Sequence, residues 1–181
     1  HSSSFQRIWG ALKGLIRKKV ISSEHTAVSE IAEALTASCD INPYKAQTIC
    51  EVLIASMDPY RKNFARSAAP IVLEKTTTGG KTKYQFNVAV DSYFRWVESG
   101  AQRIEREVQN GQLYLMNDNS KQSKGYGVIL GILESMGVLS FEMIGGANSQ
   151  LYIYINQIQA LKNIINAPYR YDNRLLDAVS E

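Results

Sequence analysis

The hydrophobic pattern changes period near residue 70, and this change limits the folds available to the chain. Before that point, apolar residues recur at intervals of three and four, the spacing of a helix face buried in a core. Amphipathic helices are therefore predicted at residues 4–19, 28–35 and 43–57. Beyond it, residues 71–76 and 81–88 are rich in β-forming residues and flank Thr78-Gly79-Gly80. This second pattern predicts a β-hairpin.

Polar residues and prolines mark the ends of these elements. Ser29 is expected to cap the second helix and Asn42, followed by Pro43, the third, because side-chain oxygens there accept hydrogen bonds from first-turn N–H groups. Asp58-Pro59 is expected to end the third helix. In the second strand, three alternating residues are predicted to face the core: Tyr84, Phe86 and Val88.

The second half of the chain partly repeats this order. The elements predicted there are a helix at 92–110 capped by Asp91, a linker at 117–125, a helix at 126–136, strands at 139–143 and 151–155, and helices at 156–166 and from 172 onward. We divide the chain into units 1–110 and 111–181. The second unit is partial, because any further helices would have to come from residues 113–119 or from beyond the chain.

Three helices followed by a hairpin is the order of a winged helix. In that fold the third helix normally lies in the major groove of DNA, and the hairpin, or wing, touches the backbone. We therefore predict a mainly α fold of the α+β class with small β-hairpin wings, formed by tandem winged-helix units.

The charge of the chain is concentrated in its first unit. Residues 1–110 hold 15 Lys and Arg against 11 Asp and Glu, whereas residues 111–181 hold 5 against 6. Clustered cations are the footprint of a nucleic-acid surface. The predicted contact residues are Tyr44, Lys45, Gln47 and Thr48 on the third helix, and Arg61, Lys62, Arg66, Lys75, Lys81 and Lys83 in the segment that follows. The alternative is that the hairpin lysines only keep an exposed edge from aggregating and that the third helix presents a solvated surface.

No catalytic constellation stands out. Gly80-Lys81-Thr82 resembles the end of a phosphate-binding loop, but Lys75 stands where that loop needs a glycine, and strand patterns flank it on both sides. His25 is interpreted as a solvated histidine and Cys50 as a small core residue. Two cysteines and two histidines cannot complete a disulfide framework or a metal cluster. We expect no catalytic residue, no cofactor and no metal in these residues.

Several features bear on the cellular context. No apolar run approaches the roughly 18 residues needed to cross a bilayer, so no membrane partner is expected. We expect reduced thiols and a cytoplasmic protein. Because the chain starts at His1 without an initiator Met or a signal peptide, we also expect it to be part of a longer protein.

Two segments resemble known families. Residues 28–35 look like the second helix of many bacterial winged-helix proteins. Residues 125–141, with the hairpin that follows, are similar to the region behind the motor of RecQ-like superfamily 2 ATP-dependent DNA helicases. The resemblance implies an accessory DNA-binding module whose partners are duplex or junction DNA and an upstream motor domain, where ATP would be hydrolysed. The zinc-binding cysteine cluster of the best-known members is missing here.

The sequence therefore favours a non-catalytic DNA-binding accessory region of a larger DNA-processing protein, an ATP-dependent DNA helicase. One alternative is a winged-helix transcription or replication regulator, in which the helix at 92–110 would mediate dimerisation. A second alternative is a protein-interaction scaffold.

Overall fold

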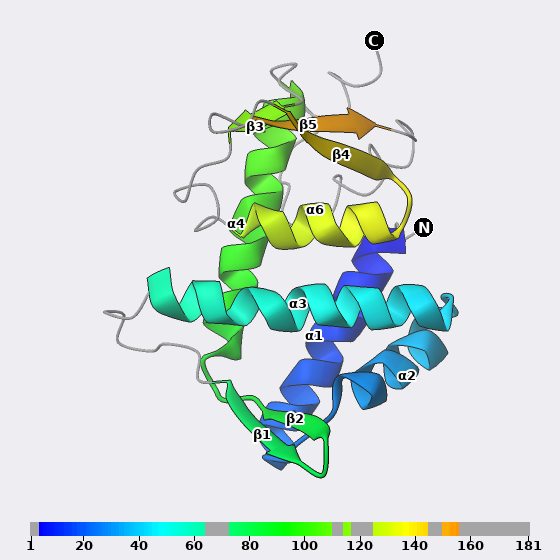
Figure 1. Ribbon diagram of the computed structural model, residues 1–181, viewed down its shortest axis with the longest axis vertical. Helices are drawn as coiled ribbons and strands as arrows, with labels where there is room; N and C mark the ends of the chain where they lie inside the picture. Colours follow the sequence, from blue (N-terminus) through cyan, green and yellow to red (C-terminus); the bar gives the residue numbers. More distant parts are fainter. Residues whose placement is uncertain (1–3, 64–72, 110–113, 117–124, 145–149, 156–181) are drawn as a thin grey trace. The chain divides into compact units, whose positions relative to one another are not determined.

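The computed structural model describes residues 4–63, 73–109, 114–116, 125–144 and 150–155 (Figure 1). Side chains are described at residues 5–58, 60–61, 73–101, 125 and 127–140. The elements are α1 (Ser4–Ser22), α2 (Val28–Cys39), α3 (Pro43–Asn63), β1 (Glu74–Thr78), β2 (Lys81–Gln85), α4 (Val90–Gln109), β3 (Tyr114–Met116), α6 (Tyr126–Ser135), β4 (Leu139–Ile144) and β5 (Gln150–Ile155). Within the described residues the fold is mainly helical with small antiparallel sheets, so the predicted α+β class is confirmed.

The chain forms two compact units. The first comprises Arg7–Arg95, and the second comprises His1–Gln6 with Trp96–Glu181. The division at residue 110 expected from the sequence gave the whole long helix to the first unit, whereas the boundary falls within α4. Residues 117–124 of the linker predicted at 117–125, and the helices predicted at 156–166 and from 172, lie outside the described residues.

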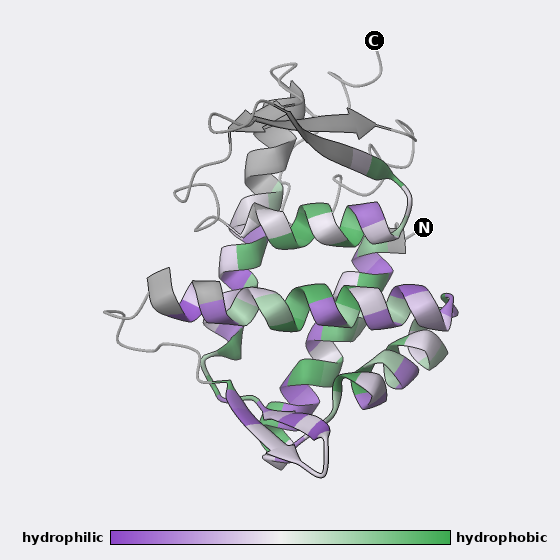
Figure 2. Cartoon of the chain, viewed as in Figure 1, coloured by the Kyte–Doolittle hydropathy of each residue, from purple (hydrophilic) through white to green (hydrophobic). Residues whose placement is uncertain are grey.

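The core of the first unit is built from the apolar faces of α1, α2 and α3. Hydrophobic and hydrophilic residues alternate around these helices, as the sequence periodicity predicts (Figure 2). Trp9, Leu12 and Ile16 of α1 are at most 1% exposed. Each large apolar side chain buried in this way contributes about 1.5–3 kcal/mol relative to exposure. The Trp9 ring also meets Phe94 edge-on, with centroids 5.6 Å apart.

Helix α3 begins where the sequence predicts but ends later. Its start is capped by Asn42, whose Oδ1 accepts a hydrogen bond from the Tyr44 N–H at 2.8 Å. The predicted end at Asp58-Pro59 is wrong, because α3 continues to Asn63. Tyr60 explains the continuation, since it is buried and meets the Tyr93 ring edge-on at 5.5 Å. Burial of this ring offsets the cost of an internal proline.

The starts of α2 and α4 differ from the prediction. Ser29 does not cap α2: Ala27 occupies the cap position without a side-chain bond. Asp91 lies inside the first turn of α4, which begins at Val90. The Asn87 side chain accepts the Ala89 N–H at 2.9 Å just before that helix.

The residues between β2 and α4 break the alternation of the hairpin. The strand ends at Gln85, and Phe86 is 3% exposed as predicted. Val88, however, is 86% exposed, so its predicted inward orientation is wrong. The turn formed by Asn87 before α4 replaces the extended backbone on which the alternation depended.

Asp91 has a different role. Its Oδ1 accepts a hydrogen bond from Arg17 Nε at 2.7 Å, and the Arg17 guanidinium lies 5.5 Å from the centre of the Phe94 ring. These contacts join the end of α1 to the start of α4 within the first unit. Because both charged side chains are about half exposed, the pair is screened and stabilises the fold only slightly.

The second unit contains a three-stranded antiparallel sheet with strand order β3-β5-β4. The predicted hairpin of β4 and β5 is confirmed. Strand β3, which pairs Leu115 with Leu151, lies in the region that we expected to supply helices. Helix α6 starts after Gly125, whose φ is 77°. Only glycine fits there, because a Cβ would lie 2.4 Å from the carbonyl oxygen of Trp96.

The two units share one feature of strand pairing. After α1, Thr26 forms an isolated antiparallel bridge with Tyr84 of β2. After α4, β3 pairs antiparallel with β5. In each unit, therefore, the segment behind the first helix pairs with the last strand of the following hairpin.

The helix caps give a direct test of this fold. Replacing Asn42→Ala is expected to cost about 1 kcal/mol of unfolding free energy, because the Tyr44 N–H loses its acceptor. The matched variant Ser29→Ala should change that free energy by less than about 0.5 kcal/mol, since the exposed Ser29 makes no cap bond. Urea denaturation measures both. Equal losses would contradict the observed caps.

Candidate nucleic-acid interface

The β1–β2 hairpin divides its cations between two faces. Thr76 pairs with Lys83, and Thr78 pairs with Lys81. Because side chains alternate along a strand, these four residues share one face, and both lysines are exposed. Lys75 pairs with Tyr84 and lies on the other face. The structure thus brings together two of the three hairpin lysines predicted for the interface.

The hairpin turn itself matches the prediction. Gly79 and Gly80 form a two-residue connection with φ values of 58° and 76°. Both angles lie in the left-handed region, which glycine adopts without strain and which fits the twist of the flanking strands. Gly80-Lys81-Thr82 therefore passes from this turn into β2, and no helix follows it as a phosphate-binding loop requires.

The loop between α1 and α2 adds a histidine to the lysine face. Thr26 and Tyr84 exchange two backbone hydrogen bonds of 2.8 Å. Strand β2 therefore pairs with β1 and also with the backbone at Thr26. The Thr26 side chain is buried, so the preceding residue, His25, lies on the opposite, lysine-bearing face. A hollow of about 310 Å³ opens on this face. Its lining residues, which we call the basic hollow, are His25, Thr76, Thr78, Lys81 and Lys83.

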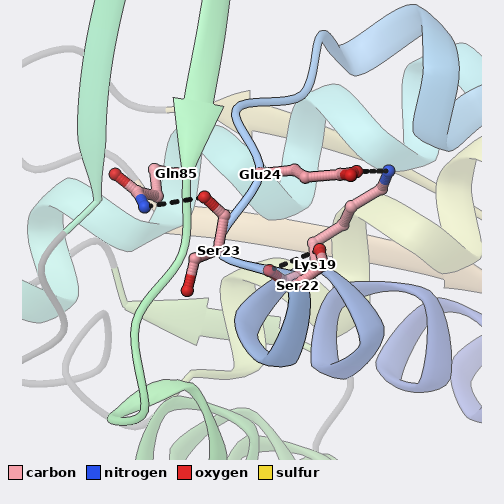
Figure 3. Close-up of polar contacts among 5 residues, drawn as sticks. All are labelled: Lys19, Ser22, Ser23, Glu24 and Gln85. Carbon is pink, nitrogen blue, oxygen red and sulfur yellow. Dashed lines mark hydrogen bonds and ion pairs between the residues drawn. The ribbon is translucent and has the colours of Figure 1, made fainter.

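Polar contacts hold this loop in place (Figure 3). Gln85 Nε2 of β2 donates to the carbonyl oxygen of Ser23 at 3.0 Å. Lys19 Nζ lies 3.4 Å from Glu24 Oε2, and Ser22 Oγ donates to the Lys19 carbonyl at 3.1 Å. These contacts fix the loop on both sides of its turn and so position His25 beside the hairpin.

His25, Thr76 and Thr78 were missed by the sequence analysis. The strand alternation placed both threonines beside lysines, which could have identified them. Nothing local could have identified His25, because its position depends on a bridge between residues 58 positions apart in the sequence, Thr26 and Tyr84.

The predicted residues of α3 divide into two pairs. Tyr44 is 82% exposed, and Lys45 is also exposed. Gln47 Nε2 instead donates to Glu51 Oε1 at 2.9 Å, and Thr48 Oγ1 donates to the Tyr44 carbonyl at 3.0 Å. Tyr44 and Lys45 are therefore the better placed of the four to contact a partner.

The remaining predicted cations are less well placed or not described. Arg61 is exposed, and its Nη2 lies 3.7 Å from Asp58 Oδ1. The side chain of Lys62 and the whole of Arg66 lie outside the described residues. Among the cations of α1, Arg17 pairs with Asp91 and Lys19 with Glu24, so these two contribute less to an outward basic surface than the sequence suggests.

The two thiols belong to the core. Burial raises the pKa of the Cys50 thiol to about 12, with a further contribution from neighbouring Glu51. Burial also raises the pKa of Cys39, whose Sγ donates to the Arg7 carbonyl at 3.6 Å. Within the described residues, no group of three or more His, Cys, Asp or Glu side chains could hold a metal ion. None of the helices described is long and apolar enough to cross a membrane.

Comparisons with protein-family models, with curated proteins and with solved structures find no match to this chain. The site is therefore interpreted from its own residues.

The thiol environments predict a chemical reactivity. At about pH 8 a thiol of raised pKa holds little thiolate, the reactive form, so Cys39 and Cys50 should react slowly with a disulfide reagent in the folded protein. Both should react rapidly after unfolding in concentrated guanidinium chloride. Absorbance of the released thiolate measures the two rates. Fast labelling of the folded chain would contradict the burial of these side chains.

Proposed function

We propose that the chain is a non-catalytic DNA-binding region built from tandem winged-helix units. The shared strand pairing supports the fold assignment, because in each unit the segment behind the first helix pairs with the last strand of the hairpin. In the first unit, α3 would then be the helix that enters the major groove and the β1–β2 hairpin would be the wing.

The observation that carries the proposal is the lysine-bearing face of the hairpin. Lys81 and Lys83 lie exposed on one face with two hydroxyl side chains and no partner that neutralises them among the described residues. Phosphate oxygens accept hydrogen bonds from lysines and hydroxyls alike. Tyr44 and Lys45, exposed at the start of α3, would supply the second contact.

The similarity of residues 125–141 to the region behind a RecQ-like helicase motor supports a larger parent protein. In this proposal the motor domain hydrolyses ATP and the present chain holds the DNA. The charge of residues 111–181, with 5 basic and 6 acidic side chains, favours a second candidate for that part: contact with protein rather than with DNA.

Binding to duplex DNA should depend strongly on salt and weakly on sequence. Phosphate contacts carry affinity without sequence information, and each neutralised phosphate releases counterions. The logarithm of the binding constant should therefore fall with the logarithm of salt concentration by about 0.9 per phosphate contacted. Fluorescence anisotropy with two unrelated duplexes measures this. A salt-independent affinity would exclude the electrostatic interface.

Substitutions on the two faces of the hairpin test which face binds. The variant Lys81→Ala with Lys83→Ala should bind less tightly and lower the salt slope by about 2, because each lysine neutralises about one phosphate. Its unfolding free energy should stay within about 0.5 kcal/mol of the parent value, since both side chains are exposed. Lys75→Ala, on the opposite face, is the control. An equal effect of Lys75→Ala would show that the binding surface is not limited to the lysine-bearing face.

A further inference from the structure

We propose that the basic hollow seats a backbone phosphate of a nucleic-acid strand and that His25 is one of the groups that bind it. This inference rests on the proposed function and adds to it a defined phosphate site with a titratable residue. It assigns a role to a histidine that the sequence pattern did not mark as a contact residue.

The chemistry of the lining suits a phosphodiester. The five residues provide two ammonium groups, two hydroxyls and an imidazole, so every side chain can donate a hydrogen bond to an anionic oxygen. Hydrogen bonds between charged donors and phosphate oxygens are among the stronger ones in proteins. The volume of about 310 Å³ lies at the lower end of the range for ligand sites.

Acidic side chains of the same face lie outside the basic hollow. Glu74 pairs with Gln85 at the far end of the hairpin, and both line a separate hollow of about 440 Å³. Glu24 is next to His25 in the chain, and its Oε2 lies 3.4 Å from Lys19 Nζ. The groups that face His25 across the hollow are therefore cations and hydroxyls, an arrangement that favours an anion.

The backbone that carries His25 is held in place before a ligand arrives. The double hydrogen bond between Thr26 and Tyr84 holds the adjacent backbone, and Gln85 holds Ser23. A donor on a preorganised backbone loses less conformational entropy on binding than one on an unconstrained loop. His25 can therefore contribute to affinity although it is exposed.

A histidine at the phosphate makes binding depend on pH. A protonated imidazole binds the phosphate better than a neutral one, so the complex takes up protons and tightens as pH falls. Lysines and phosphodiesters ordinarily keep their charge between about pH 6 and pH 8. The chain has only two histidines, His1 and His25, so single substitutions identify the source of the dependence.

The test uses the full 181-residue chain and a short duplex without terminal phosphates, which would themselves titrate. Anisotropy at about 50 mM salt gives the dissociation constant at about pH 8 and pH 6. We expect the parent protein to bind about two- to fivefold more tightly at the lower pH. His25→Gln should abolish this gain, and His25→Lys should bind equally well at both values. The control His1→Gln should keep the gain.

The outcomes separate the two proposals. If the parent protein binds DNA but His25→Gln keeps the full pH dependence, the phosphate site is wrong and the DNA-binding function stands. If no DNA binds at low salt, both proposals fail. If a poly-glutamate peptide binds more tightly than DNA and with the same dependence on His25, the hollow is a site for acidic peptides and the nucleic-acid assignment is overturned. Melting curves of each variant confirm that it is folded.

Discussion

The bridge between Thr26 and Tyr84 is the interaction on which the candidate interface depends. Two backbone hydrogen bonds of 2.8 Å join the loop behind α1 to the last strand of the hairpin. Thr26 is fully buried, and its Oγ1 has no hydrogen-bond partner among the described residues. An unsatisfied buried hydroxyl costs about 1–3 kcal/mol. Thr26 therefore contributes through its backbone pairing rather than through its hydroxyl. The pairing places the preceding residue, His25, in solvent beside the lysines.

A second set of contacts joins α3 to α4 within the first unit. The Tyr93 hydroxyl donates to the Leu53 carbonyl at 3.1 Å and also bonds to Ser56. Burial raises the pKa of this phenol, which favours the protonated form that donates this hydrogen bond. With Tyr60 edge-on to the same ring, this network keeps α3 helical beyond Pro59. The helix proposed to read DNA is thus anchored at its far end, leaving its exposed first turn for contact.

The sequence predicted those features that local chemistry decides. Periodicity located the helices and the hairpin, and Asn42-Pro43 located the start of α3, because a cap acts over three residues. Prediction from the sequence failed where a distant residue decided the outcome. Burial of Tyr60 against Tyr93 extended α3. The error at the start of α4 was local, because Asn87, just before the helix, accepts the Ala89 N–H while Asp91 lies inside the first turn. Strand β3 was missed because three residues show too short an alternation to recognise.

The same distinction applies to the interface. Lys81 and Lys83 could be paired from the alternation of one strand, but their separation from Lys75 follows from the register between two strands. His25 required a third segment, which only the folded chain brings to the hairpin. The charge count of residues 1–110 also includes Arg17 and Lys19, yet both lie against carboxylates of the same unit. A basic surface is therefore decided by which cations remain unpaired after folding, and in this hairpin two of the three lysines, Lys81 and Lys83, line one hollow.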